Sequence, residues 1–144
     1  MTPIKIETIK DKLFKLSEYT NFIEDITKRP DKEIISDLSI YYSLEHILQL
    51  SIQVILDIGT HILAEKFNDN PKTYAEVIDA LGQRGVIEKD FATSQKEMAK
   101  FRNKLIHDYD SVDKKKTLFY ARSAPEIFRI FGKAFLVFAE NLGI

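Results

Sequence analysis

Residues 34–67 have the sequence IISDLSIYYSLEHILQLSIQVILDIGTHILAEKF. Apolar side chains recur in it three, four or seven residues apart, at Ile34, Leu38, Tyr41, Leu44, Leu48 and Ile55. This spacing places them on one face of an α-helix. Pro30 precedes the segment and Asn68-Asp69-Asn70-Pro71 follows it. We therefore expect one long helix from Asp31 to about Phe67, with Gly59 as a point where it can bend.

The same helical spacing extends over most of the chain on both sides of this segment. Upstream, Ile6, Ile9, Leu13 and Leu16 predict a first helix. Downstream, Thr73-Tyr74-Ala75-Glu76 is a capping box that begins a short helix ending between Gly82 and Gly85. We expect a fourth helix over residues 88–107 and a last one from Asp113, kinked or split at Pro125. No stretch alternates long enough to indicate a strand, so the sequence predicts a single all-α domain over residues 1–144, an up-and-down helical bundle of four to five main helices.

The composition excludes several classes of protein. Of the 144 residues 44% are hydrophobic and none is cysteine, so a globular core is expected and disulfides, cysteine catalysis and iron–sulfur clusters are excluded. Neither G-x-x-x-x-G-K nor G-x-G-x-x-G occurs, which argues against phosphate-binding loops of those types. The N-terminus lacks the pattern of a secretory signal, and no uninterrupted apolar run is long enough to indicate a membrane span. We therefore expect a cytoplasmic protein with no membrane contact.

Charge is unevenly distributed along the chain. The net charge is −1, but the segment from Arg84 to Arg122 carries ten Lys and Arg against six Asp and Glu. This third of the chain is therefore basic, with a net charge of +4. The remaining residues together carry a net charge of −5. A basic segment of this size permits contacts with phosphate groups without requiring them.

The strongest candidate for a catalytic site lies at the end of the fourth expected helix. It is the segment Arg102-Asn103-Lys104-Leu105-Ile106-His107-Asp108-Tyr109. Arg102 lies at the border of the apolar face, whereas Asn103 and His107, four residues apart, share the polar face. Arg102 and His107 are about 140° apart around the helix, which favours a composite site where two such helices meet, and hence a dimer.

These residue types suit RNA cleavage without a metal. Histidine can exchange a proton with a 2′-hydroxyl or a leaving oxygen, and arginine can bind the phosphate as negative charge develops. Lys100 and Lys104 lie nearby and can contact the RNA backbone. The residues alone leave a second interpretation open, a helix C-terminus that carries a favourable cation.

The segment Arg102-Asn103-x-x-x-His107-x-Tyr109 resembles the R-x4-H-x-Y motif of HEPN-domain ribonucleases, specifically of HepT-type toxins. The resemblance covers roughly residues 34–120 and includes Leu56–Leu63 and Gly85-Val86-Ile87. It implies a homodimeric helical bundle that acts as a metal-independent ribonuclease without a cofactor. Arg102 and His107 would be the catalytic pair and Asn103 a supporting residue. It also points to tRNA or mRNA as the substrate, and we favour tRNA.

The resemblance further implies a protein partner and a modification site. Toxins of this type are paired with a minimal nucleotidyltransferase (MNT) antitoxin that transfers AMP to the tyrosine of the motif, here Tyr109. The flanking Asp108, Asp110 and Ser111 indicate that the helix frays there, which would leave the phenol accessible to a modifying enzyme.

Three other hypotheses compete with this interpretation. The chain can be a catalytically silent helical scaffold that keeps the fold for dimerisation alone. Asp57, His61 and Glu65 are spaced by four and resemble a set of metal ligands, although residues in line on one helix rarely converge on one ion. His107-Asp108 is the dipeptide of HD phosphohydrolases, but that class needs more histidines than His46 and His61 supply. We expect His46 to be a partly buried structural residue.

Overall fold

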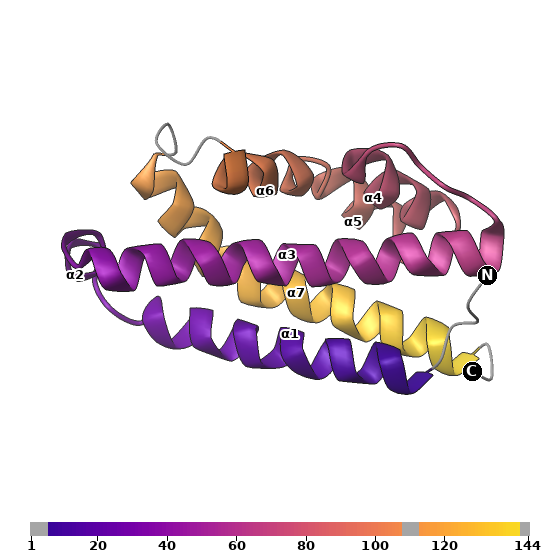
Figure 1. The fold of residues 1–144 in the computed structure, drawn as a ribbon, viewed down its shortest axis with the longest axis horizontal. Helices are drawn as coiled ribbons and strands as arrows, with labels where there is room; N and C mark the ends of the chain where they lie inside the picture. Colours follow the sequence, from indigo (N-terminus) through magenta and orange to yellow (C-terminus); the bar gives the residue numbers. More distant parts are fainter. Residues whose placement is uncertain (1–5, 108–112, 142–144) are drawn as a thin grey trace.

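The computed structural model describes residues 6–107 and 113–141, and within these ranges the chain is helical with no strand. In chain order the helices are α1 (Ile6–Ile26), α2 (Asp31–Ser36), α3 (Leu38–Phe67), α4 (Tyr74–Gln83), α5 (Lys89–Ser94), α6 (Met98–His107) and α7 (Lys114–Asn141) (Figure 1). The prediction of an all-α fold is confirmed.

The helices form an up-and-down bundle with four long passes of the chain. Figure 1 shows α1 running one way along the molecule, α3 returning beside it, α4 to α6 leading back along the far side of α3, and α7 returning again. α1 packs on α7 and α3, whereas α4 and α6 pack on α3. α3 is therefore the central helix, and the layer of short helices α4 to α6 lies on the face of α3 away from α1.

The long helix expected from Asp31 is interrupted at Asp37, where the prediction is wrong. Asp37 has an extended backbone, with φ −101° and ψ 100°, and its carboxylate accepts hydrogen bonds from the backbone N–H groups of Ser39 and Ile40. It therefore caps a new helix, α3, and ends α2. Leu38, expected on the apolar face, is 53% exposed because it lies in the first turn after this break.

Two further helix boundaries differ from expectation. The fourth expected helix is broken into α5 and α6, because Gln95 leaves helical geometry at φ −107° and ψ 11°. The last helix is unbroken from Lys114 to Asn141, so Pro125 does not split it. Pro125 lies inside this helix and is buried, although its ring removes one backbone hydrogen bond.

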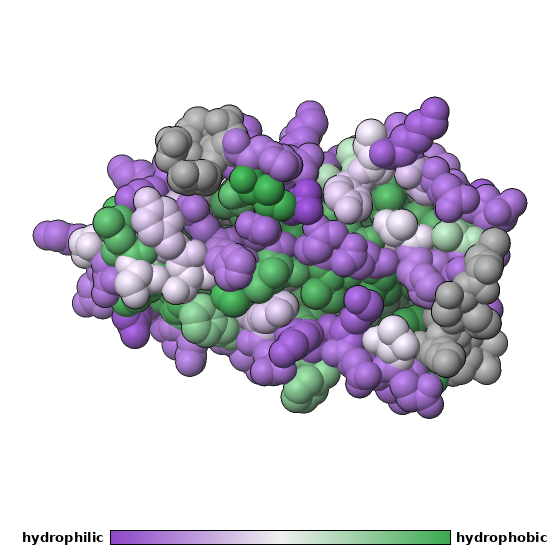
Figure 2. All heavy atoms as spheres, in the orientation of Figure 1, coloured by the Kyte–Doolittle hydropathy of each residue, from purple (hydrophilic) through white to green (hydrophobic). Residues whose placement is uncertain are grey.

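The core is built around α3 and closed by the aromatic side chains of α7. Fully buried residues include Tyr41 on α3 and Phe128, Phe131 and Phe135 on α7. By length and composition alone, α3 is long and apolar enough to cross a membrane, and half of its most apolar window is buried inside the fold. Its contacts with helices on several sides account for that apolarity. Polar side chains cover most of the face shown in Figure 2.

Two glycines let α4 approach its neighbours closely. A Cβ atom on Gly59 would lie 2.7 Å from Cδ1 of Leu81, and one on Gly82 would lie 2.5 Å from Cβ of Ala92. Gly59 thus permits close packing of α4 on α3. α3 is one continuous helix through Gly59. This approach brings Tyr74, the first residue of α4, over the polar side chains of α3.

Candidate functional site

Arg102 lies on α6 at the border between core and surface, as the sequence predicts. The buried residues Met98, Ala99 and Leu105 fix α6 against α3, and Arg102 is half-buried beside them. Its Nη2 donates a hydrogen bond to Oε1 of Gln53 on α3. Its Nη1 donates to Oδ1 of Asn103 at 3.0 Å. The guanidinium is therefore bound at two of its nitrogens by amide oxygens.

Two more side chains complete the surroundings of this guanidinium. The ring of Tyr74 lies 5.2 Å from Cζ of Arg102, a cation–π contact. Nε2 of Gln53 donates to Oδ1 of Asp57 at 2.7 Å and to the hydroxyl of Tyr74 at 3.4 Å. A chain of hydrogen bonds thus runs from Asp57 through Gln53 to Arg102.

No carboxylate among the described residues neutralises the positive charge of Arg102. Over residues 6–107 and 113–141, no ion pair joins Arg102 to a carboxylate. Its Nε is buried and has no hydrogen-bond acceptor within the described residues. A guanidinium that is fixed in place but still fully charged can bind an anion such as phosphate.

His107 lies at the last turn of the same helix, and its side chain is exposed. α6 is unbroken from Met98 to His107, so the angle of about 140° between Arg102 and His107 around the helix applies. Asn103 is exposed like His107, four residues later on the same helix, and its amide oxygen accepts a hydrogen bond from Arg102. Tyr109, the expected modification site, lies outside the described residues.

The two lysines expected to contact RNA are both on the exposed side of α6. Nζ of Lys100 lies 3.6 Å from Oε1 of Glu97, and both side chains are mostly exposed. Exposed pairs of this kind are weak and are easily exchanged for another anion. Lys104 is also exposed, one turn from Lys100.

Sequence reasoning missed Gln53 and Tyr74. A glutamine inside an apolar segment was the signal for Gln53, and the proximity of Tyr74 depends on how α4 crosses α3. Asp57 proves to be the acceptor for Gln53. In the part of the chain that the structure describes, no group of three His, Asp or Glu side chains is placed to hold a metal ion. His46, expected to be partly buried, is exposed.

A hollow of about 430 Å³ lies beside the Arg102 site, lined by Tyr42, Glu45, His46 and Gln49 of α3 and Leu105 of α6. Its residues on α3 are about one to three turns before Gln53, and Leu105 is about one turn after Arg102. Burial raises the pKa of the Glu45 carboxyl group, while hydrogen bonding to Tyr41 and the charge of Lys114 act in the opposite direction. The hollow thus combines an exposed aromatic ring, an exposed imidazole and a buried carboxyl group.

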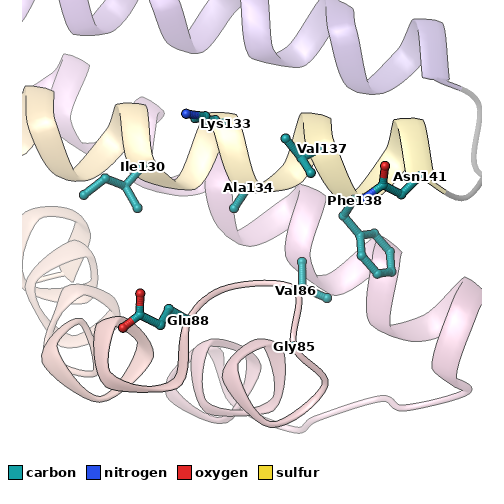
Figure 3. A pocket seen from close by; sticks show the side chains of 9 residues that line it. All are labelled: Gly85, Val86, Glu88, Ile130, Lys133, Ala134, Val137, Phe138 and Asn141. Carbon is teal, nitrogen blue, oxygen red and sulfur yellow. The ribbon is translucent and has the colours of Figure 1, made fainter.

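A second hollow, of about 400 Å³, lies away from this site (Figure 3). Figure 3 shows it between the C-terminal half of α7, including Ile130, Ala134 and Phe138, and the loop of Val86. Its lining is mainly apolar and contains none of the motif residues. The Arg102 site is therefore the better candidate for chemistry.

Comparison with known proteins identifies the family to which the chain belongs. Residues 16–131 match the family described as Ribonuclease HepT-like. The tRNA nuclease HepT of Aphanizomenon flos-aquae is 26% identical over 113 residues, which are 78% of this chain and 77% of that protein.

Two solved structures share the fold at 20% identity and a TM-score of 0.79 each. One is the tri-AMPylated HEPN toxin of Shewanella oneidensis in complex with MNT antitoxin, where the match covers 88% of this chain and 94% of that one. The other is YutE of Bacillus subtilis, a cytosolic protein of unknown function, where it covers 98% and 94%.

Proposed function

This chain belongs to the HepT-like ribonuclease family, and from that premise we propose that it is a toxin that cleaves tRNA without a metal ion. The observation that carries the proposal is the environment of Arg102, which is bound by two amide oxygens and an aromatic ring and pairs with no carboxylate of the described residues. It lies on the same short helix as an exposed histidine, His107. The relative described as a tRNA nuclease supports the choice of substrate.

The proposed reaction uses the 2′-hydroxyl of the RNA as nucleophile. The O2′–P bond forms and the P–O5′ bond breaks, with a 2′,3′-cyclic phosphate as product. A neutral imidazole accepts the proton of the 2′-hydroxyl, and a protonated imidazole gives a proton to the departing O5′. Arg102 binds the non-bridging phosphate oxygens and stabilises the charge that builds on them. Asn103 supports Arg102 through the bond to Nη1.

A homodimer fits this chemistry better than a monomer. The angle of about 140° between Arg102 and His107 makes it difficult for both to reach one phosphate from a single helix. Two copies related by a twofold axis would bring two α6 helices together and supply one imidazole as base and the other as acid. Light scattering on the purified protein tests this; a 16.7 kDa species that retains activity would exclude the dimer.

Exposed groups around the site provide the remaining contacts to RNA. We assign to Lys100 and Lys104 the binding of phosphate groups in the RNA backbone. An adjacent base would enter the hollow next to Leu105, where the ring of Tyr42 can stack on it.

The test of the ribonuclease proposal is cleavage of bulk deacylated tRNA by the purified protein, in EDTA and in Mg²⁺. We expect discrete fragments with cyclic phosphate ends in both buffers. His107→Ala should lose this activity while keeping its helical circular dichroism, and His61→Ala on α3 serves as the matched histidine control. A folded wild-type protein that leaves tRNA, mRNA and ribosomal RNA intact would support the silent scaffold instead.

We also propose a nucleotidyltransferase antitoxin as partner and Tyr109 as the residue it modifies. The likeness to a tri-AMPylated toxin bound to MNT antitoxin supports this extension. Both tRNA and ATP are cytoplasmic, which is where we place the protein. Attack of the Tyr109 phenol oxygen on the α-phosphorus of ATP would form a phosphodiester to AMP and release pyrophosphate. The added negative charge would compete with RNA for Arg102.

Mass spectrometry tests the modification. The protein is incubated with ATP and the nucleotidyltransferase encoded next to it, and we expect a mass gain in multiples of adenylate together with loss of tRNA cleavage. Tyr109→Phe should show no gain, whereas Tyr19→Phe, on α1, should gain as the wild type does. An equal gain in Tyr109→Phe would overturn this assignment.

A further inference from the structure

We propose that Gln53 is the positioning residue for Arg102, with Asp57 setting the direction of its amide, so that the arginine is fixed without losing its charge. This inference rests on the proposed ribonuclease function and assigns it two residues outside the R-x4-H-x-Y motif. Both lie on α3, 45 or more positions before Arg102 in the sequence.

The direction of the Gln53 amide is set by its two N–H groups. One donates to Asp57 at 2.7 Å, and the other can reach the hydroxyl of Tyr74 at 3.4 Å. This leaves Oε1 as the atom that faces Nη2 of Arg102. A rotated amide would place N–H donors against the guanidinium, where only donors are present, and would lose the bond to Asp57.

The choice of an amide rather than a carboxylate preserves the binding capacity of Arg102. A guanidinium has five N–H groups. One on Nη1 is used by Asn103, one on Nη2 is used by Gln53, and the one on Nε is buried. The second N–H group on each Nη is not engaged by any described residue, so two donors remain for the oxygens of a phosphate. A carboxylate at position 53 would pair with the charge and compete with that phosphate.

The two roles can be separated by two substitutions at the same position. Gln53→Met keeps the length of the side chain and removes its hydrogen bonds, so Arg102 loses its position but keeps its charge. Gln53→Glu loses the bond to Asp57 but keeps an acceptor for Arg102 and adds a negative charge, so Arg102 stays bound at position 53 and loses its binding capacity for phosphate. Asp57→Asn should have the same effect on Arg102 as Gln53→Met, but a smaller one.

Steady-state cleavage of tRNA distinguishes these outcomes. We expect Gln53→Met to lower kcat about 10-fold to 100-fold with little change in KM, because orientation matters most in the transition state. We expect Gln53→Glu to raise KM about 10-fold or more. Gln83→Met is the matched control, because Gln83 on α4 also donates to an aspartate four residues away, Asp79 at 3.0 Å, and lies outside the site. It should cleave as the wild type does.

The salt dependence of RNA binding provides a readout that loss of stability alone would not change. Measured in a His107→Ala background to prevent cleavage, the slope of log K against log salt should fall by about 0.7 to 0.9 in Gln53→Glu, the value of one phosphate contact. An unchanged slope and unchanged KM in Gln53→Glu would overturn the proposal, even if the variant melts at a lower temperature.

A measurement without RNA keeps this inference separate from the proposed function. The buried Nε–H of Arg102 should give a slowly exchanging signal in ¹H–¹⁵N spectra of the intact protein, identified by its loss in Arg102→Lys. That signal should exchange at least 10-fold faster in Gln53→Met and be unchanged in Gln83→Met. Fast exchange in the wild type would overturn the role of Gln53. Slow exchange in a protein that cleaves no RNA would overturn only the ribonuclease.

Discussion

Arg129 and Arg102 each join two helices, and they do so with opposite chemistry. On the α1–α7 face, Nη1 of Arg129 lies 2.8 Å from a carboxylate oxygen of Glu24, and this pairing lowers the pKa of Glu24. On the α3–α6 face, Arg102 is bound by the amide oxygens of Gln53 and Asn103. Arg84 and Arg122 also pair with carboxylates. In these three arginines, Arg84, Arg122 and Arg129, a carboxylate neutralises the charge of the guanidinium.

The chemistry of the partner distinguishes a structural arginine from one that serves a ligand. Both contact residues far away in the sequence. Only the partners differ. A carboxylate cancels the positive charge of the guanidinium, whereas an amide oxygen fixes the orientation of the guanidinium without cancelling its charge. A fixed arginine with neutral partners therefore remains able to bind an anion.

The largest expected difference between the two faces is in catalysis. Arg102→Ala should lower kcat/KM for tRNA cleavage by about 10² to 10³, the typical effect of removing a group that stabilises transition-state charge. Arg129→Ala should leave it within about twofold. Parallel single-turnover assays check this; equal losses in both variants would mean that Arg102 acts only through the fold.

The second expected difference is in packing. Ala at Gly82 places a Cβ atom 2.5 Å from Cβ of Ala92, between closely packed backbones, and should lower the free energy of unfolding by about 1–3 kcal/mol. Ala at Gly132, on the α1–α7 face, has Leu13 at an ordinary 3.7 Å and should raise it by about 0.5–1 kcal/mol through helix propensity. Urea denaturation measures both, and a stabilising Gly82→Ala would contradict the close α4–α5 approach.

The smallest expected difference is in the pH dependence of stability. The pKa of Glu24 is lowered by its bond to Arg129, so ionised Glu24 adds stability above about pH 4.5, which is lost as the pH falls. The pKa of Glu45 is raised by burial, so ionisation of Glu45 reduces stability as the pH rises above that value. The effects of Glu24→Gln and Glu45→Gln on Tm, each relative to wild type, should therefore move in opposite directions between pH 4 and pH 7. Parallel changes would contradict this assignment.

The sequence predicts what depends on local spacing and misses what depends on how helices cross. Periodic apolar residues and caps give the four passes of the bundle, and the helical wheel places Arg102 at the border of the core. The break at Asp37 was missed because the apolar spacing continues through it, whereas the cap depends on two backbone hydrogen bonds.

The contacts of Arg102 lay beyond sequence reasoning for a different reason. Gln53 is 49 residues away, and its distance from Arg102 is set by the crossing of α6 over α3. The position of Tyr74 depends on Gly59, whose missing side chain lets α4 descend onto α3. Such contacts follow from the sum of all packing interactions, and no short motif encodes them.

The packing of α1 on α7 has a consequence for synthesis of the chain. Translation makes α1 first and α7 last, at about 5–20 residues per second. The apolar face of α1 thus stays uncovered by α7 for roughly 5–25 seconds. During that interval α3 is its first available partner, so a hairpin of α1 and α3 should form on the ribosome. Synthesis of α7 is then the event that closes the bundle.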